Sequence, residues 1–225
     1  MKKKDIIMML IIIILIVLII TGGITIIKLK NELKNGQENK ISNKSNTITE
    51  VTSGAVKFKY EYENLNGTKT PSGETYNTLN IDLDNPIKYV TLNELVNIID
   101  NEDAYIYISS PSCPFCRATV ETLLQITKEL NIDTLYYFDA FKENSEENYD
   151  ELMTKLQEKE IVRVNDEGKK TWGIPILLKT KDGQVVSKVR GVSYQLNDGQ
   201  SRYDSLTDEQ KKEVYDRYYE ALTME

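Results

Sequence analysis

Two cysteines separated by two residues, Cys113 and Cys116, most constrain the fold of this chain, because its 225 residues contain no other cysteine. They follow a short apolar run, residues 104–109, typical of a buried strand, and precede a helical pattern that begins near Pro114. At a helix N-terminus the free backbone N–H groups and the helix dipole favour a thiolate. The spacing therefore predicts a pair that can close into a disulfide or open to a dithiol.

Other uses of this cysteine pair are less well supported by the sequence. A zinc site needs two further nitrogen or sulfur ligands, and the chain has no histidine and no third cysteine. A purely structural disulfide stays open as an alternative. It would close only a very short loop, however, and the stabilisation that a disulfide provides grows with loop length. The pattern favours redox use of the pair, and we expect no metal and no cofactor.

The N-terminus predicts a membrane anchor. Three lysines follow Met1, and residues 6–27 then carry no charge over 22 positions, long enough to span a bilayer core. A cleaved secretory signal is the alternative, although the apolar run resumes after Gly23 and no A-x-A cleavage site follows. We therefore predict an uncleaved transmembrane anchor over residues 1–27. The polar composition of residues 28–54 then predicts a tether.

Charge sets the expected orientation and partners only in part. The lysines on the two sides of the anchor are nearly balanced, so the positive-inside rule does not fix the orientation. A dithiol pair on a tether is most useful outside the reducing cytosol, so we expect an extracytoplasmic domain on a single-pass anchor. The chain has 28 basic and 35 acidic residues, a net charge of −7. An acidic domain without a basic stripe argues against nucleic acid as a partner.

The first part of the folded region, residues 55–90, predicts an added N-terminal β-hairpin. Apolar and polar residues alternate in two stretches around a turn-rich segment, as they do in half-buried strands. The alternating apolar residues are Val56, Phe58, Tyr60 and Tyr62 in the first stretch and Leu79, Ile81 and Leu83 in the second. No group in this segment suits thiol chemistry, so we expect the hairpin to stand apart from the dithiol.

The remaining residues, 91–225, predict a single α/β domain. Capping patterns at Thr91 and Thr207 begin two helices, and a third helix follows the cysteines. The other expected elements are strands at residues 105–109 and 134–140, a helix after Ser145, and a hairpin of residues 174–179 and 184–189. This order predicts a central mixed sheet flanked by helices.

The same order, with Cys-x-x-Cys at the head of the first crossover helix, resembles the thioredoxin-like superfamily. A second match is the segment of residues 172–178 (Trp-Gly-Ile-Pro-Ile-Leu-Leu), which is similar to the thioredoxin segment that carries a cis-proline. In that family the proline packs against the active-site disulfide, and the backbone of the preceding residue pairs with the substrate. The resemblance implies that Cys113 and Cys116 are the catalytic pair and that Ile174 and Pro175 bind substrate. An ordinary trans proline at the start of a strand is the alternative.

The sequence also departs from the thioredoxin pattern. Thioredoxin has a buried aspartate six residues before its first cysteine, where this chain has Tyr107, so no internal base is expected there. Ser112 replaces the usual tryptophan, and Pro114-Phe115 resembles the glutaredoxin dipeptide more than that of thioredoxin. The direction of the reaction therefore stays open among oxidation, reduction and isomerisation.

Within the superfamily, the chain resembles the membrane-anchored thioredoxin-like proteins of Gram-positive bacteria, including the bacteriocin transport accessory proteins. These combine an N-terminal anchor, a polar tether and a Cys-x-x-Cys near the middle of the sequence. The resemblance implies a monomeric thiol–disulfide oxidoreductase that acts on protein thiols and disulfides, with a redox partner in the membrane. A non-catalytic accessory or binding module of a membrane export system is the alternative function.

Overall fold

A computed structural model of the protein describes residues 52–142 and 147–224. The predicted anchor and nearly all of the predicted tether lie outside these residues. Within the described residues, no helix has both the length and the apolar character needed to cross a membrane.

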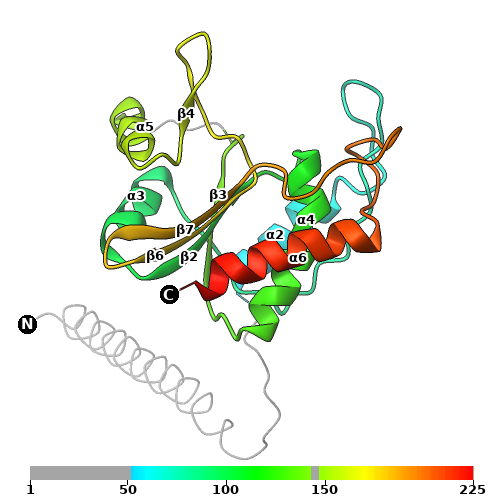
Figure 1. Ribbon diagram of the computed structural model, residues 1–225, viewed down its shortest axis with the longest axis horizontal. Helices are drawn as coiled ribbons and strands as arrows, with labels where there is room; N and C mark the ends of the chain where they lie inside the picture. Colours follow the sequence, from blue (N-terminus) through cyan, green and yellow to red (C-terminus); the bar gives the residue numbers. More distant parts are fainter. Residues whose placement is uncertain (1–51, 143–146, 225) are drawn as a thin grey trace, which may run out of the picture. The chain divides into compact units, whose positions relative to one another are not determined.

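A five-stranded mixed sheet forms the centre of the fold (Figure 1). Its strands lie in the order β1-β3-β2-β6-β7. The strands are β1 (Ile87–Tyr89), β2 (Ala104–Ser109), β3 (Leu135–Asp139), β6 (Ile176–Lys181) and β7 (Gln184–Arg190). β3 pairs in parallel with β1 and β2, whereas β6 is antiparallel to both β2 and β7. A separate two-stranded ribbon joins β4 (Arg163–Val164) to β5 (Lys170–Thr171).

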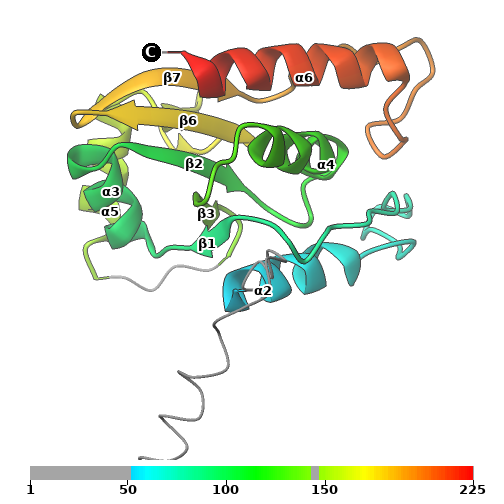
Figure 2. The same ribbon diagram turned by 90° about the horizontal axis from the view of Figure 1, so that it is seen from below.

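Helices cover both faces of this sheet. The helices are α2 (Ser53–Glu63), α3 (Leu92–Asn101), α4 (Pro114–Glu129), α5 (Tyr149–Glu158) and α6 (Asp208–Thr223). Buried residues of α2, α4 and α6 pack with Tyr107, Tyr137 and Leu177 of the sheet in one apolar core. Those of α3 and α5 pack with Ile106 and Ile108 in a second core on the opposite face. Figure 2 shows α6, α4 and α2 in that order along one face, from β7 to β1.

The predicted fold class is confirmed: the protein has the mixed α/β architecture of a thioredoxin-like fold. The capping boxes predicted at Thr91 and Thr207 are both present and begin α3 and α6. The predicted hairpin near the C-terminus is the pair β6–β7. Residues 143–146, where the prediction placed the start of a helix at Ser145, lie outside the described part, and α5 begins at Tyr149.

The predicted N-terminal β-hairpin is wrong, because the first of its two strands is the helix α2. Thr52 caps this helix by accepting a hydrogen bond from the backbone N–H of Ala55 at 3.1 Å. Phe58 and Tyr62, four residues apart, are buried on one face, while Tyr60 is 67% exposed. Alternation put Phe58, Tyr60 and Tyr62 on one face of a strand. The helical period instead separates Tyr60 from the other two.

The second predicted strand, residues 79–83, is an irregular segment that lies along α2. Its backbone is paired with side chains instead of with a neighbouring strand. The side chain of Asn66 accepts from Leu79 N–H and donates to Leu79 C=O, at 3.0 and 2.8 Å. Glu63 accepts from Ile81 N–H and Lys59 donates to Ile81 C=O, at 2.7 Å each. These contacts satisfy an extended backbone that buries Leu79 and Ile81, which explains the alternation without a sheet.

Candidate active site

The two cysteines lie where β2 gives way to α4, as the sequence predicted. Cys113 is the N-cap of α4 and Pro114 occupies the first turn. The sulfur of Cys113 accepts a hydrogen bond from the backbone N–H of Cys116 at 3.2 Å. It therefore has the capping role that a serine or aspartate oxygen usually fills at a helix start. Negative charge on this sulfur is favoured by the helix end.

Both cysteines are free thiols in this structure, and their environments differ. Cys113 is 4% exposed and Cys116 is fully buried. A hydrogen bond from the Cys116 side chain, opposed by burial and aided by backbone N–H groups, lowers the pKa of the Cys113 thiol. Burial, together with that same hydrogen bond, raises the pKa of the Cys116 thiol well above its usual value. Of the two thiols, Cys113 therefore ionises more readily, and Cys116 is the one that retains its proton.

Tyr107 is the residue at which the sequence predicted no internal base, and it contacts Cys116. Its hydroxyl donates to the backbone C=O of Cys116 at 3.5 Å, and burial raises its pKa well above the usual range. Tyr107 therefore stays protonated and cannot serve as the missing base. The neighbouring polar contact is a 2.6 Å hydrogen bond between the hydroxyls of Ser109 and Tyr62, both fully buried.

Tyr62 contradicts the prediction that residues 55–90 stand apart from the dithiol. It lies in α2, yet its hydroxyl bonds to the last residue of β2, directly before the loop that carries the cysteines. Its negative form would repel a Cys116 thiolate, and burial is the main reason that its pKa is raised well above the usual range. The N-terminal segment therefore packs against the dithiol site through Tyr62.

A buried arginine, Arg117, also connects the N-terminal segment to the dithiol site. The Arg117 side chain, fully buried one residue after Cys116, donates to backbone carbonyls and amide side chains in three segments. The acceptors are the C=O groups of Tyr62 (2.7 Å), Pro111 (3.3 Å) and Asn77 (2.7 Å), with the side-chain oxygens of Asn66 (2.8 Å) and Asn77 (3.2 Å). Burial lowers its pKa, and none of its acceptors is a carboxylate. Arg117 thus joins the cysteine loop to the N-terminal segment.

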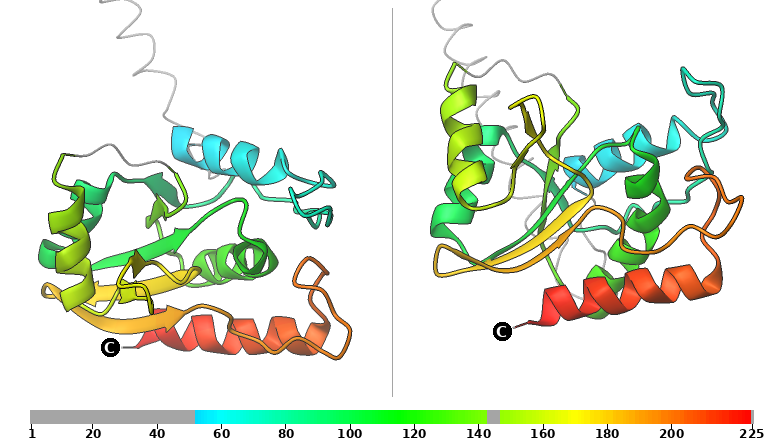
Figure 3. Two further views of the ribbon diagram at one scale, coloured as in Figure 1. Left: turned by 90° about the horizontal axis from the view of Figure 1, so that it is seen from above. Right: turned by 45° about the horizontal axis from the view of Figure 1, so that its top comes forward.

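Two segments far apart in the sequence meet near the dithiol. The ring of Tyr76, which follows α2, packs edge-on against the ring of Tyr203, which precedes α6, with 5.7 Å between centroids. Arg117 and Arg202 extend this contact, at 5.3 Å from the Tyr76 ring and 5.4 Å from the Tyr203 ring. Figure 3 shows both segments on the same side of the domain. Tyr76 and Arg202 both interact electrostatically with Cys113, so this contact lies near the dithiol.

The substrate-binding residues inferred from the resemblance lie at the same edge of the sheet. The peptide bond between Ile174 and Pro175 is cis, as the resemblance implied. Ile176, the next residue, pairs with Ile108 near the end of β2. Because the cysteine loop leaves the sheet directly after β2, the antiparallel register brings the proline to the start of that loop.

The sequence contained a signal for Arg117 that we did not use. Arg117 stands three residues before Val120 and six before Leu123, and so lies on the buried face of α4 that those apolar residues define. For Tyr62 no comparable signal existed, since the alternation in its stretch predicted a strand. Within residues 52–142 and 147–224, no three cysteine, histidine or acidic side chains lie together in a way that could hold a metal ion.

Comparison with known proteins adds little to this geometry. No protein-family model matches the chain, and no curated protein matches it. Among solved structures, a thioredoxin from Aeropyrum pernix is similar over 47% of this chain and 75% of its own, with 22% identity and a TM-score of 0.32. The chemistry must therefore be argued from the residues.

Proposed function

We propose that the protein is a membrane-anchored thiol–disulfide oxidoreductase whose dithiol domain faces away from the cytosol. The observation that carries this proposal is that the two thiols have pKa values shifted in opposite directions. Cys113 accepts helix N–H groups and has a lowered pKa, while Cys116 is buried and has a raised pKa. A nucleophile and a resolving thiol need this difference.

The reaction has two exchange steps. The Cys113 thiolate attacks one sulfur of a substrate disulfide, and that S–S bond breaks to release a substrate thiolate and leave a mixed disulfide. Cys116 then loses its proton and attacks the Cys113 sulfur, which closes the Cys113–Cys116 disulfide and releases the second thiolate. Two electrons pass from the dithiol to the substrate, whose thiolates take up protons. The same steps in reverse introduce a disulfide.

Substrate placement in this proposal follows the resemblance. The substrate polypeptide pairs with the backbone of Ile174 next to Pro175, which the sheet register brings to the cysteine loop. Substrates are protein thiols and disulfides, and a membrane redox partner restores the active state of the dithiol. The uncharged run at residues 6–27 supports the anchor, and the redox chemistry supports the outward orientation.

The experiment that tests the function is disulfide reduction by the full-length protein in detergent, with insulin as substrate and dithiothreitol as reductant. We expect the wild type to catalyse the reduction and Cys113→Ser to abolish it, because no other side chain supplies the attacking sulfur. Cys116→Ser should instead accumulate mixed disulfides, detectable by mass spectrometry.

The non-catalytic binding module is the other outcome of this test. Activity that survives Cys113→Ser, or a wild type without activity across a series of redox buffers, would favour it over the enzyme. Digestion of the exposed domain by protease added to intact protoplasts checks the outward orientation independently. Protection from the protease would contradict that orientation.

A further inference from the structure

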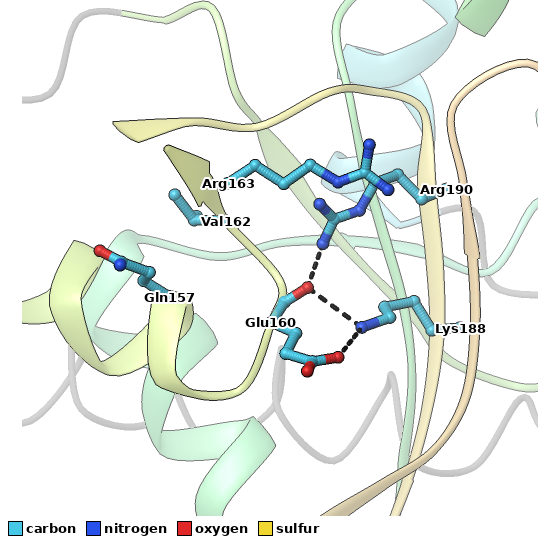
Figure 4. Close-up of a pocket in the computed structure, with 6 residues that line it drawn as sticks. All are labelled: Gln157, Glu160, Val162, Arg163, Lys188 and Arg190. Atoms are coloured by element: carbon cyan, nitrogen blue, oxygen red, sulfur yellow. Dashed lines mark hydrogen bonds and ion pairs between the residues drawn. The ribbon is translucent and has the colours of Figure 1, made fainter. Parts of the chain in front are cut away.

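A basic pocket lies beside the loop that carries Pro175, although the protein as a whole is acidic. It has a volume of about 450 Å³. Its lining residues are Gln157, Glu160, Val162, Arg163, Lys188 and Arg190 (Figure 4). Three cations thus converge there against one carboxylate, in a sequence whose net charge is −7. The cations come from the β4–β5 ribbon and from the edge strand β7, so no basic stripe is visible in the sequence.

Capping of α5 accounts for two of these cations. The backbone C=O of Glu160, just beyond the end of α5, accepts from Lys188 Nζ at 3.0 Å and also from the guanidinium of Arg190. Lys188 also forms an ion pair with the Glu160 carboxylate at 3.5 Å. Cations at the C-terminus of a helix complement its dipole. These contacts give Lys188 and Arg190 a structural role, so their presence needs no ligand to explain it.

Arg163 has no such structural role. Within the described residues its guanidinium forms no hydrogen bond and no ion pair, and Figure 4 shows it next to the guanidinium of Arg190. The charge of Arg163 contributes, after burial, to the lowered pKa of Arg190. The buried Nε of Arg190 also has no hydrogen-bond partner. Two guanidinium groups placed together without an anion between them form a site suited to a carboxylate or another planar anion.

The pocket adjoins the segment that we propose pairs with the substrate. Arg190 is paired with Ile176 in the sheet, and the next residue, Gly191, donates its N–H to the C=O of Pro175. The Arg190 side chain lies against Gly173, since a Cβ at that glycine would stand 3.7 Å from Arg190 Cδ. An extended substrate paired at Ile174 advances about 3.3 Å per residue. Three residues of such a substrate span about 10 Å, which defines the positions near the substrate cysteine that we test for contact with the pocket.

We propose that this pocket is a subsite for an acidic side chain of the substrate polypeptide, close in sequence to the cysteine that Cys113 attacks. The proposal rests on the proposed function, because it assumes that a substrate polypeptide occupies the Pro175 loop. Arg163 supplies a charge that is not already engaged, and the neighbouring guanidinium of Arg190 adds to the positive potential of the pocket. An acidic segment would otherwise be repelled by the net negative charge of the protein, so the pocket selects where such a segment docks.

The test compares two disulfide-bonded peptides that differ only in having glutamate or glutamine within three residues of the cysteine, on either side. The full-length protein in detergent reduces them with dithiothreitol as reductant. We expect kcat/KM for the glutamate peptide to be about two- to fivefold higher at low salt, as befits a partly exposed ion pair. The ratio should fall toward one at about 1 M salt, where the Debye length is about 3 Å.

Substitutions assign the preference to the pocket. Arg163→Gln should bring the ratio of the two rates close to one, and Arg163→Glu should invert it. Lys169→Gln is the matched control, because Lys169 is an exposed cation in the turn between β4 and β5 that does not line the pocket and pairs with Glu167 at 3.1 Å. That variant should keep the wild-type ratio.

The remaining outcomes separate the two proposals. Equal rates on both peptides in the wild type, or a glutamate preference that survives Arg163→Gln, would overturn the subsite and leave the oxidoreductase in place. A wild type that reduces neither peptide would overturn the oxidoreductase itself, and the subsite with it.

Discussion

The two halves of the dithiol site are built by different means. Residues 91–224 supply both sulfurs, and there neighbouring groups set the chemistry, since Cys113 accepts from the Cys116 side chain and from N–H groups at the start of α4. Residues 52–86 supply no reacting group, and their contribution comes from side chains and carbonyls that pack against the cysteine loop. The comparison teaches that the reactivity of Cys113 is set within one helical turn, first by the Cys116 side chain and then by helix N–H groups, whereas the burial of the pair depends on contacts from distant parts of the sequence.

The largest effect that would sharpen this comparison comes from Arg117, which joins the two halves. In Arg117→Met the backbone C=O groups of Pro111 and Asn77 lose their donor, whereas that of Tyr62 keeps a hydrogen bond from Leu65 N–H at 3.4 Å. An unsatisfied buried carbonyl costs about 1–3 kcal/mol, so the two carbonyls predict a loss of about 2–6 kcal/mol in the free energy of unfolding. Urea denaturation followed by circular dichroism measures it. The upper end of that range equals the whole stability of a marginally stable domain.

Arg117→Lys is the control for charge. A lysine keeps the positive charge but cannot present donors in the planar fork of a guanidinium, so it should restore only part of the stability. A methionine variant within about 1 kcal/mol of the wild type would show that the two halves are held together by apolar packing alone.

Phe58 provides the next largest effect, and it tests the helix against the hairpin directly. Phe58 is fully buried, with ring centroids 4.4 Å from Tyr62 and 4.9 Å from Tyr137. We expect Phe58→Ala to cost about 3–5 kcal/mol in thermal or urea denaturation. Tyr60→Ala is the matched control and should cost less than about 0.5 kcal/mol, since this ring is 67% exposed. Similar losses at both positions would indicate that the two residues share one face, as in a strand.

The sequence allowed prediction of the second half of the fold far better than the first. Helix starts at Thr91 and Thr207 follow from local capping, and the position of the dithiol follows from a strand-to-helix junction, so short segments were sufficient. The secondary structure around Phe58 was predicted wrongly. Its alternating pattern fits a strand, but the same pattern also places positions 58 and 62 on one face of a helix. Deciding between these interpretations requires the partners on the sheet, which no local pattern contains.

The candidate site shows the same limit. The cysteines and the cis-proline were predictable, because each has a short signature in the sequence. Two of the acceptors of Arg117, on Asn77 and Tyr62, lie 40 and 55 residues before it in the sequence. Such contacts arise only after α2 packs against the sheet, so the role of the arginine was not visible from its neighbours in the sequence.

A smaller effect is expected at the contact between Tyr62 and Ser109. Tyr62→Phe keeps the ring and removes one buried 2.6 Å hydrogen bond, which leaves the Ser109 hydroxyl without that partner. We expect a loss of about 1–2 kcal/mol in urea denaturation. Ser109→Ala in the Tyr62→Phe background should recover part of it, because both partners are then absent. A double variant as unstable as the sum of the two single variants would show that the two hydroxyls do not interact.

The smallest effect concerns the thiolate of Cys113 and tests whether the local half of the site acts alone. The side-chain hydrogen bond from Cys116 is the main reason that the pKa of Cys113 is lowered. A lower pKa places the midpoint of its alkylation rate, plotted against pH, below that of an ordinary thiol. In Cys116→Ser a hydroxyl can still donate, whereas in Cys116→Ala it cannot, so we expect the midpoint to lie higher in the alanine variant. Iodoacetamide kinetics with mass spectrometry measure both midpoints.

Because helix N–H groups persist in both variants, the alanine midpoint should still fall below that of the unfolded protein. If it reaches the unfolded value, the helix end contributes nothing and the cysteine pair alone sets the reactivity.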